Sequence, residues 1–457
     1  MKRVKDTRES ESATGEDARD RLRRQLTLTD TTFLVVSSVI GAGIFITPGA
    51  VASSIPEPSL FLFAWVLGGA LSLAGALANA ELGGLFPRAG GDYVYLREAF
   101  HPVAGFLVGW LTFFVIYAGT VATLATASGD ILARLFDAPG NSSTAIAIAT
   151  VVVTTWVNYS GLRAGASFNN LTAILKVAAI ALLVLLGFAA AGPEGGSPGA
   201  TTAPRPASTL EGFALAMSPV LFTYLGWNAP IYVASEIRDP ARNLPRSLFL
   251  GLGICTGLYL LLNLVYLRVT TPGELASSTP AGELVARALF GEFGGELASI
   301  LILLSILGCL NATILVGPRI AYAMALDGLF FRGGDRVHET RGTPHIALIV
   351  QAMVAIGLIA VLRTFPSVLD YTTFAIVLAT MADVASLYAL RRKRPDAPRP
   401  YRAWGYPFLP AAYFVANAAI ALAMILGRPL ECLIALGVTA TGLPFLWLFS
   451  RRPQPAP

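Results

Sequence analysis

Long apolar stretches separated by short polar connectors run through most of this 457-residue chain. A helix needs about 20 apolar residues to cross the hydrocarbon core of a bilayer. The chain is 54% hydrophobic and 13% charged, whereas soluble proteins carry about 25% charged residues. So few charges cannot cover a globular surface, and we therefore expect an all-α polytopic membrane protein.

Twelve segments are long and apolar enough to be candidate transmembrane helices. They are residues 31–54, 58–85, 103–127, 143–160, 168–191, 213–235, 246–268, 296–326, 344–363, 367–390, 407–427 and 430–449. With both termini cytoplasmic, most of the 33 lysines and arginines fall in cytoplasmic segments, as the positive-inside rule requires. The basic balance therefore needs no nucleic-acid partner. Since no signal peptide is visible, we expect an inner or plasma cell membrane.

The first and sixth candidate spans contain residues that interrupt helices. The stretch SSVIGAGIFITPG, residues 37–49, holds Gly41, Gly43 and Pro48, and Pro219 and Pro230 flank the stretch YLGWN at 224–228. A break at membrane depth is tolerated only where protein or a polar cavity receives the freed backbone groups. Interruptions at these two positions are typical of two inverted repeats of five spans around a central site.

Each break exposes carbonyls at the end of one half-helix and amides at the start of the next. The expected groups are the carbonyls of Ser38, Val39, Ile40, Phe222, Thr223 and Tyr224 and, beyond Gly41, the amides of Ala42, Gly43 and Ile44. A zwitterion complements both kinds of group, so the backbone alone can bind the part that all α-amino acids share. The alternative is that the glycines only allow close helix packing.

Five motifs in order resemble the amino acid permeases of the amino acid–polyamine–organocation superfamily. They are GAGIFITPG (41–49), AELGGLFPRAGGDYVYL (80–96), YLGWNAPIYVASEIRDPARNLPRSL (224–248), PRIAYAMALDGLF (318–330) and LRRKRPDAPRPYRAWGYP (390–407). The resemblance covers residues 30 to 450, roughly. It implies a leucine-transporter-type fold of 12 transmembrane helices with a 5+5 inverted repeat, broken helices 1 and 6, and transport by alternating access.

The resemblance also implies a domain organisation. It comprises a disordered cytoplasmic tail (1–28), a first repeat (29–192), an exterior linker (193–212), a second repeat (213–390), a basic cytoplasmic loop (391–406), accessory spans 11 and 12 (407–450) and a short cytoplasmic tail (451–457).

In such permeases the substrate carboxylate meets first-span amides, here those of Ala42 and Gly43. The amino group meets carbonyls that match Val39, Phe222 and Leu225. The remaining expected pocket residues are Val115, Ile116, Thr120, Tyr224, Trp227, Asn228 and Asn311. None of them is acidic, so a cationic side chain would lack a charge partner. We therefore expect a small-molecule substrate from the neutral L-amino acids rather than lysine, arginine or a polyamine, and no cofactor.

Lys176 lies in the fifth candidate span, within SFNNLTAILKVAAIALLVLL. An ammonium near the membrane centre costs about 2.5–3.5 kcal/mol on insertion scales, and burial disfavours its charged form. Some proton-coupled relatives carry a lysine at the matching place, so the resemblance predicts that Lys176 couples protons to uptake by holding the first-span break. The alternatives are that Lys176 only tunes an exchange cycle, or that its side chain reaches the membrane surface.

Four further ionisable residues are candidates for gating or for structural ion pairs: Glu81, Arg88, Glu236 and Asp383. Otherwise the spans hold almost no ionisable groups, which argues against an intramembrane enzyme, and no rings of polar residues indicate a channel. The three cysteines, Cys255, Cys309 and Cys432, lie in apolar runs, and residues 128–142 contain no cysteine. We therefore expect no metal site and no disulfide-linked heavy chain.

Overall fold

The fold is taken from a computed structural model, which describes residues 22–139, 142–190, 209–277, 280–362, 365–427 and 429–451. The predicted amino-terminal tail up to residue 21 and most of the predicted linker at 193–212 lie outside these described residues. Within them, the regular structure is helical apart from one isolated bridge between Leu26 and Ile237. The predicted all-α class is therefore confirmed for the described part of the chain.

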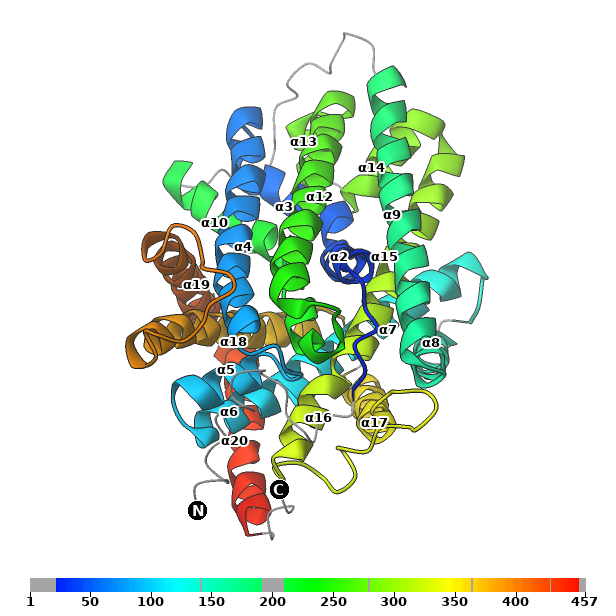
Figure 1. The fold of residues 1–457 in the computed structure, drawn as a ribbon. Helices are drawn as coiled ribbons and strands as arrows, with labels where there is room; N and C mark the ends of the chain where they lie inside the picture. The colour runs from blue at the N-terminus through cyan, green and yellow to red at the C-terminus, as the bar shows by residue number, and fades with distance from the viewer. Residues whose placement is uncertain are drawn as a thin grey trace, which may run out of the picture.

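The helices follow one another along the chain as Figure 1 shows. They are α2 (Leu28–Val39), α3 (Gly43–Ser54), α4 (Pro58–Leu85), α5 (Asp92–Ala99), α6 (Pro102–Trp110), η1 (Leu111–Tyr117), α7 (Ala118–Leu135), α8 (Ser142–Tyr159), α9 (Leu162–Ala190), α10 (Thr209–Thr223), α11 (Ala229–Tyr232), η2 (Ala234–Glu236), α12 (Pro240–Val269), α13 (Pro272–Ser277), α14 (Ala281–Phe290), α15 (Glu292–Val316), α16 (Pro318–Leu326), α17 (His345–Leu362), α18 (Phe365–Lys393), α19 (Phe408–Gly427) and α20 (Pro429–Ser450).

Among the described residues, eight helical stretches are long and apolar enough to cross a membrane, or nine if the bent pair α2–α3 counts as one span. This establishes a polytopic helical membrane protein. The segments predicted at 143–160, 213–235 and 344–363 correspond to α8, to the interrupted pair α10–α11 and to α17. These helices are shorter or less apolar than that criterion requires, so the count of twelve spans stays a prediction.

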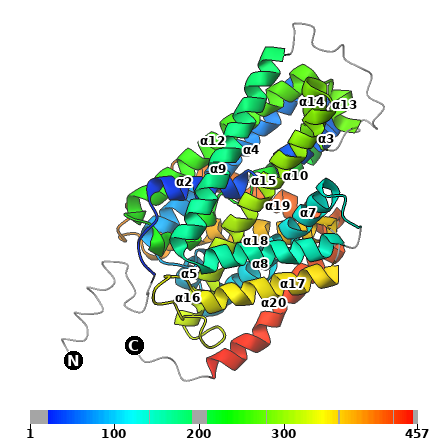
Figure 2. The same ribbon diagram turned by 90° about the vertical axis from the view of Figure 1, so that its right-hand side faces the viewer.

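Two sets of helices cross each other around the first broken span. In Figure 2, α8 and α17 run across the view while α4, α9 and α12 run diagonally. Helix α2 packs against α9, α12 and α15, whereas α3 packs against α10, α13 and α14. The two halves of the broken span therefore have different neighbours, which allows each half to be held independently.

The first break lies where the sequence predicts it. Helix α2 starts with a capping box between Thr27 and Asp30 and ends at Val39, and α3 begins at Gly43 with its axis bent by 45°. The only residues between the helices are Ile40, Gly41 and Ala42.

At the second break, Gly226 lies close to the backbone of Ser38 near the first break. Helix α10 ends at Thr223, residues 224–228 form turns, and α11 begins at Ala229. Gly226 has a φ of +100°, which L-residues with a side chain rarely adopt. A Cβ atom at this position would lie 2.6 Å from the carbonyl oxygen of Ser38. Only glycine therefore lets the broken spans approach this closely.

Gly226→Ala should lower the apparent melting temperature of the detergent-purified protein and reduce substrate binding. A left-handed backbone costs about 1–2 kcal/mol for a residue with a Cβ atom, and the clash with Ser38 adds to this cost. The matched control is Gly257→Ala, because Gly257 lies in α12 and a methyl group at this position would meet no atom within 4 Å. Alanine is favoured over glycine inside helices, so the control should match or exceed the wild type. Equal melting temperatures for G226A and wild type would contradict this account.

Candidate substrate-binding site

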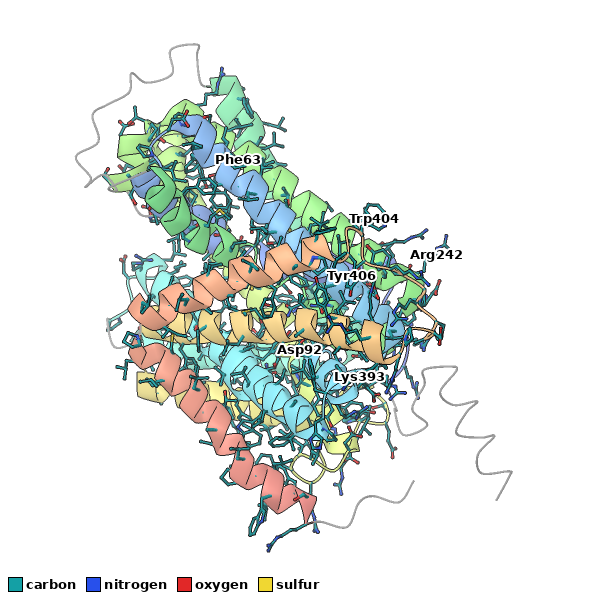
Figure 3. The ribbon with its side chains drawn as sticks, turned by 90° about the vertical axis from the view of Figure 1, so that its left-hand side faces the viewer. Phe63, Asp92, Arg242, Lys393, Trp404 and Tyr406 are labelled. Atoms are coloured by element: carbon teal, nitrogen blue, oxygen red, sulfur yellow. The ribbon has the colours of Figure 1, made fainter. Side chains whose placement is uncertain are left out.

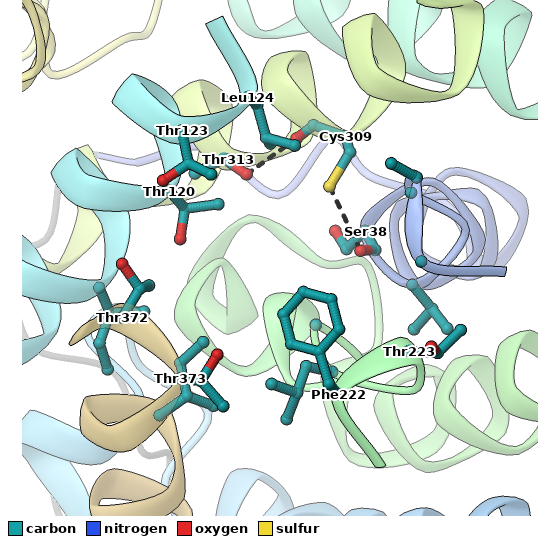
Figure 4. Close-up of a pocket in the computed structure, with 18 of the residues that line it drawn as sticks. Ser38, Thr120, Thr123, Leu124, Phe222, Thr223, Cys309, Thr313, Thr372 and Thr373 are labelled. Carbon is teal, nitrogen blue, oxygen red and sulfur yellow. Dashed lines mark hydrogen bonds between the residues drawn. The ribbon is translucent and has the colours of Figure 1, made fainter. Parts of the chain in front are cut away.

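A cavity of about 580 Å³ lies at the two helix breaks. Such a volume is typical of small-molecule sites, which span about 300–1,000 Å³. Its walls come from both broken spans and from η1, α7, α15, α18 and α19. Figure 4 shows residues of these elements around the open space, with Ser38 on one side and Thr120, Thr372 and Thr373 on the other. The cavity thus lies where the two interrupted spans meet.

The cavity extends away from the face that carries the amino-terminal end of α2. Its lining includes Thr47 in α3, Pro219 in α10 and Ala127 in α7, all in the helix halves on the other side of the breaks. The lining also reaches Met424 near the end of α19.

No charged side chain is present among the described residues that line the cavity. The side chains with oxygen or nitrogen atoms are hydroxyl, amide or phenol groups: Ser38, Thr47, Thr120, Thr123, Thr223, Thr313, Thr372, Thr373, Asn228, Tyr117 and Tyr232. Most of the remaining wall is aliphatic or aromatic. Such a surface suits a neutral side chain, because a buried charge without a partner is costly.

Nine of the fifteen predicted substrate-contact residues line the cavity: Val39, Gly41, Ala42, Gly43, Ile116, Thr120, Phe222, Leu225 and Asn228. The other six are not part of the lining. They are Ile40, Ile44, Val115, Tyr224, Trp227 and Asn311, and all are buried. The predicted spacing located the right helices but did not fix which face of each helix turns toward the cavity.

Two of these six buried residues have polar contacts that explain their positions. The amide of Asn311 donates to the backbone carbonyl of Gly165 (3.1 Å), and its carbonyl accepts from Asn158 (2.8 Å), so it joins α15 to α8 and α9. The Tyr224 hydroxyl donates to the carbonyl of Trp65 (3.0 Å). These contacts place both side chains behind the cavity wall.

Most of the carbonyls that the sequence predicts to be free lie within hydrogen-bonding distance of a side-chain donor. The Tyr259 hydroxyl on α12 lies 2.9 Å from the Val39 carbonyl and 3.2 Å from the Thr223 carbonyl. A hydroxyl has one proton and donates to one acceptor at a time. The hydroxyl therefore donates to one of the two carbonyls at a time, and the Val39 carbonyl also accepts from the Gly41 amide at 2.9 Å. A third carbonyl, that of Ser38, accepts from the Cys309 thiol at 3.4 Å (Figure 4).

The amides at the start of α3 are not capped by a side chain. Ala42 is the N-cap residue and makes no side-chain capping bond, and the helix starts at Gly43. The first amides of a helix have no carbonyl partner within the helix and carry its positive dipole end. Ala42 and Gly43 both line the cavity, so the start of α3 turns toward this space, an arrangement that favours an anionic group.

Lys176 on α9 extends to the carboxyl end of α2. Its ammonium donates to the backbone carbonyls of Ser37 (2.9 Å) and Ile40 (2.8 Å), and its side chain is 1% exposed. The negative end of the α2 dipole faces this cation. The alternative that Lys176 reaches the membrane surface is therefore wrong.

The face opposite the cavity opening is closed by contacts between the broken spans and their neighbours. Glu236 pairs with Arg319 through two contacts of 2.6 and 3.1 Å, and both side chains are buried. The amide of Leu26 donates to the Glu236 carbonyl, and the amide of Arg238 donates to the Leu26 carbonyl. The ends of both broken spans on this face are thereby joined to each other.

Glu81 pairs with Arg391 and Arg399, and not with Arg88, the partner that proximity in the sequence suggests. Its carboxylate also accepts from the amide of Ala403 at 2.7 Å. The basic loop after α18 therefore folds back over the end of α4. Arg391 and Arg399 lie more than 300 positions from Glu81 in the sequence, so this pairing could not be predicted from sequence proximity.

A sequence model described as amino acid permease matches residues 26–438. The chain belongs to the amino acid permease family. This permease is 30% identical over 435 residues to the serine/threonine exchanger SteT of Bacillus subtilis, covering 94% of the permease and 98% of SteT. It is 29% identical to human large neutral amino acids transporter small subunit 2, covering 93% and 80%, and 29% identical to human Asc-type amino acid transporter 1, covering 95% and 84%.

These relatives are transporters rather than enzymes, so the permease is an integral membrane protein of amino acid transport. Sequence reasoning did not single out Tyr259 or the cavity residues of α18 and α19. A tyrosine inside a long apolar segment such as GICTGLYLLLNLVY is a polar group that needs a partner, and this was the signal for Tyr259. The cavity residues Ile420, Ala423 and Met424 offered no such signal, because they do not differ from lipid-facing residues in composition.

Tyr259→Phe should destabilise the permease and weaken substrate binding. The change removes the hydroxyl that joins Val39 and Thr223 and leaves a buried carbonyl without this donor, which costs about 1–3 kcal/mol. The melting temperature with and without substrate measures both effects. Tyr266→Phe is the matched control, because Tyr266 is also buried in α12, but its hydroxyl makes a single long hydrogen bond, to the Ile44 carbonyl at 3.4 Å. If Y259F and Y266F behave alike, the bridging role of Tyr259 is wrong.

Proposed function

We propose that this permease is a secondary active transporter of neutral L-amino acids that works by alternating access and couples uptake to protons. The observation that carries the proposal is the cavity without charged side chains at two helix breaks, which is lined by the uncapped start of α3 and by residues at the carboxyl ends of α2 and α10. A net-neutral zwitterion is the ligand that complements both sets of backbone dipoles.

In the proposed complex the substrate carboxylate lies at the amides of Ala42 and Gly43. The ammonium group lies at the carbonyls of Val39, Phe222 and Leu225. The side chain then faces the hydroxyl-rich wall made by Thr120 and the threonines of α18. Leu225 reduces the space beside the second break, which favours small or slender side chains.

The proposed architecture has twelve transmembrane helices. Residues 29–192 and 213–390 form two inverted repeats of the leucine-transporter type, and spans 11 and 12 are accessory. Its support is the placement of the breaks, since each lies in the first helix of one repeat and both contact the same cavity. With both termini in the cytoplasm, the cavity extends to the exterior side of the inner or plasma membrane.

Alternating access then requires the cytoplasmic side to open. The Glu236–Arg319 pair and the Leu26 backbone bonds close this side, and we assign Glu236 to gating. Removing one partner of a buried ion pair costs about 3–5 kcal/mol, so the pair must exchange its partners for water as the side opens. Glu81 and Arg88 keep a structural role at the same face.

Lys176 is the proposed coupling residue. When protonated, it holds the carboxyl end of α2 through Ser37 and Ile40. Loss of its proton removes this charge-assisted contact and releases α2 from α9. Movement of α2 toward the open state would then follow proton release to the cytoplasm.

Amino acid exchange is the second candidate function. It is favoured by the serine/threonine exchanger SteT, which matches nearly the full length of the permease. In an exchanger the same residues bind substrate and Lys176 only tunes the cycle. No disulfide-linked partner is proposed for either function, because residues 128–142 contain no cysteine.

Proteoliposomes that contain the purified permease should take up neutral amino acids with small side chains and leave lysine, arginine and polyamines in the medium. A panel of labelled amino acids, run with and without an inward proton gradient and with and without internal amino acid, measures the substrate and the mode. Accumulation in empty vesicles under a proton gradient indicates symport, and uptake that requires internal substrate indicates exchange. Efficient uptake of lysine would contradict the neutral-substrate proposal.

Lys176→Met should reduce the proton dependence of uptake, because it removes the titrating contact to the end of α2. The initial rate of uptake is measured over a range of external pH in wild type and variant. Lys393→Met is the matched control, since Lys393 is the other lysine among the described residues and donates to the Ala99 carbonyl outside the cavity. An unchanged rate and pH profile in K176M would remove Lys176 from the mechanism.

A further inference from the structure

Two buried carboxyl groups meet beneath the floor of the cavity. Asp92 is the first residue of α5 and Asp383 lies in α18, and both side chains have no exposed surface. Helices α5 and α18 pack against each other, and Figure 3 shows Asp92 beside α18. From the sequence, Asp383 was predicted only as a gating candidate, and Asp92 was not predicted as a site residue.

One oxygen of each carboxyl has a donor. The Tyr232 hydroxyl donates to Oδ2 of Asp92 at 2.6 Å, and the side-chain amide of Asn79 donates to Oδ2 of Asp383 at 3.0 Å. The Oδ1 atoms of both residues are buried and accept from no donor in the described structure. The two carboxyl groups lie within hydrogen-bonding reach of each other. Two carboxyl groups form a hydrogen bond only if one of them carries a proton.

The surroundings offer no positive charge to replace that proton. Neither carboxyl forms an ion pair with a cation among the described residues. The titratable groups that face the pair are phenols from four elements: Tyr95 in α5, Tyr117 in η1, Tyr232 in α11 and Tyr413 in α19. Phenols titrate near pH 10 in water, roughly, so they are neutral donors at physiological pH.

Two ionised carboxylates in contact, away from water, repel each other strongly, and one of them takes up a proton instead. Burial raises the pKa of the Asp92 carboxyl above its ordinary value, although the Tyr232 hydrogen bond opposes this. Together with the two unpaired Oδ1 atoms, this indicates a place for one proton between the residues.

We propose that Asp92 and Asp383 form a proton-binding site that holds one shared proton while the side of the permease that carries the amino-terminal end of α2 is closed. The site adjoins the cavity at two points. Tyr232 lines the cavity and donates to Asp92, and Ala379 lines it one helical turn before Asp383 on α18. Tyr232 thus contacts both the cavity and the carboxyl pair.

The site links protonation to opening of the closed side. Tyr232 is four residues before Glu236, within the second half of the broken sixth span. Movement of this segment takes the Tyr232 hydroxyl away from Asp92 and admits water to the pair. Both carboxylates then ionise, and the one proton leaves to the aqueous phase on that side. This inference rests on the proposed alternating access and adds a proton site distinct from Lys176.

Infrared spectroscopy of the purified permease tests the site without reliance on transport. At neutral pH the wild type should show the C=O band of a protonated carboxylic acid, with the downshift in D₂O that such a band undergoes. Asp92→Asn and Asp383→Asn should each remove the band, because the remaining carboxylate then has no acid to share a proton with. Tyr232→Phe keeps both carboxyls and should shift the band. Asp130→Asn, at an exposed position of α7, is the control that should leave it unchanged.

Absence of the band in wild type, or its persistence in both D92N and D383N, overturns the proposal even if a variant folds poorly, since the wild-type measurement stands alone. In proteoliposomes, D383N and D92N should flatten the pH dependence of uptake. A permease that shows the band but moves no amino acid under any gradient would refute the proposed function and leave the proton site intact.

Discussion

The structure of this permease depends on the need of backbone groups at two helix breaks to find partners inside a membrane. Leaving a backbone amide or carbonyl without a hydrogen-bond partner in hydrocarbon costs roughly several kcal/mol of free energy. A broken transmembrane helix is therefore stable only if other groups hydrogen-bond to its free amides and carbonyls. Here the side chains of Lys176, Tyr259 and Cys309 donate hydrogen bonds to the carbonyls at the end of α2. The start of α3 has no side-chain cap, and in the proposed complex the substrate carboxylate occupies this place. The cavity exists because the helices are interrupted where they meet.

The same contacts join the two broken spans into one unit. Tyr259 reaches Val39 on the first span and Thr223 on the sixth, and Gly226 approaches the Ser38 carbonyl. On the opposite face Leu26 and Ile237 form a bridge. Both ends of α2 therefore contact the sixth span and the segment that carries Glu236, and the proposed coupling of substrate to gate uses these contacts.

The sequence alone predicted the membrane class, the two breaks and the contact of Lys176 with the first one, because glycine, proline and an isolated charge in apolar segments have few structural explanations. It did not predict which faces of the helices turn inward. Asn311, Tyr224 and Trp227 are buried behind the cavity, since spans packed on all sides carry no amphipathic pattern that orients them. Asp92 was missed because it lies in a short helix outside the predicted spans, and its neighbour Asp383 is 291 positions away in the sequence.

Equilibrium binding of a transported amino acid and two analogues tests the central claim most directly. One analogue replaces the carboxylate by a neutral amide, and the other lacks the amino group. A hydrogen bond to a charged group is worth about 1.5–3 kcal/mol, and each 1.4 kcal/mol, roughly, is tenfold in affinity. If the helix breaks bind the zwitterion through main-chain dipoles, each analogue should bind at least ~10-fold more weakly than the parent. Equal affinity of either analogue and the parent would contradict the account.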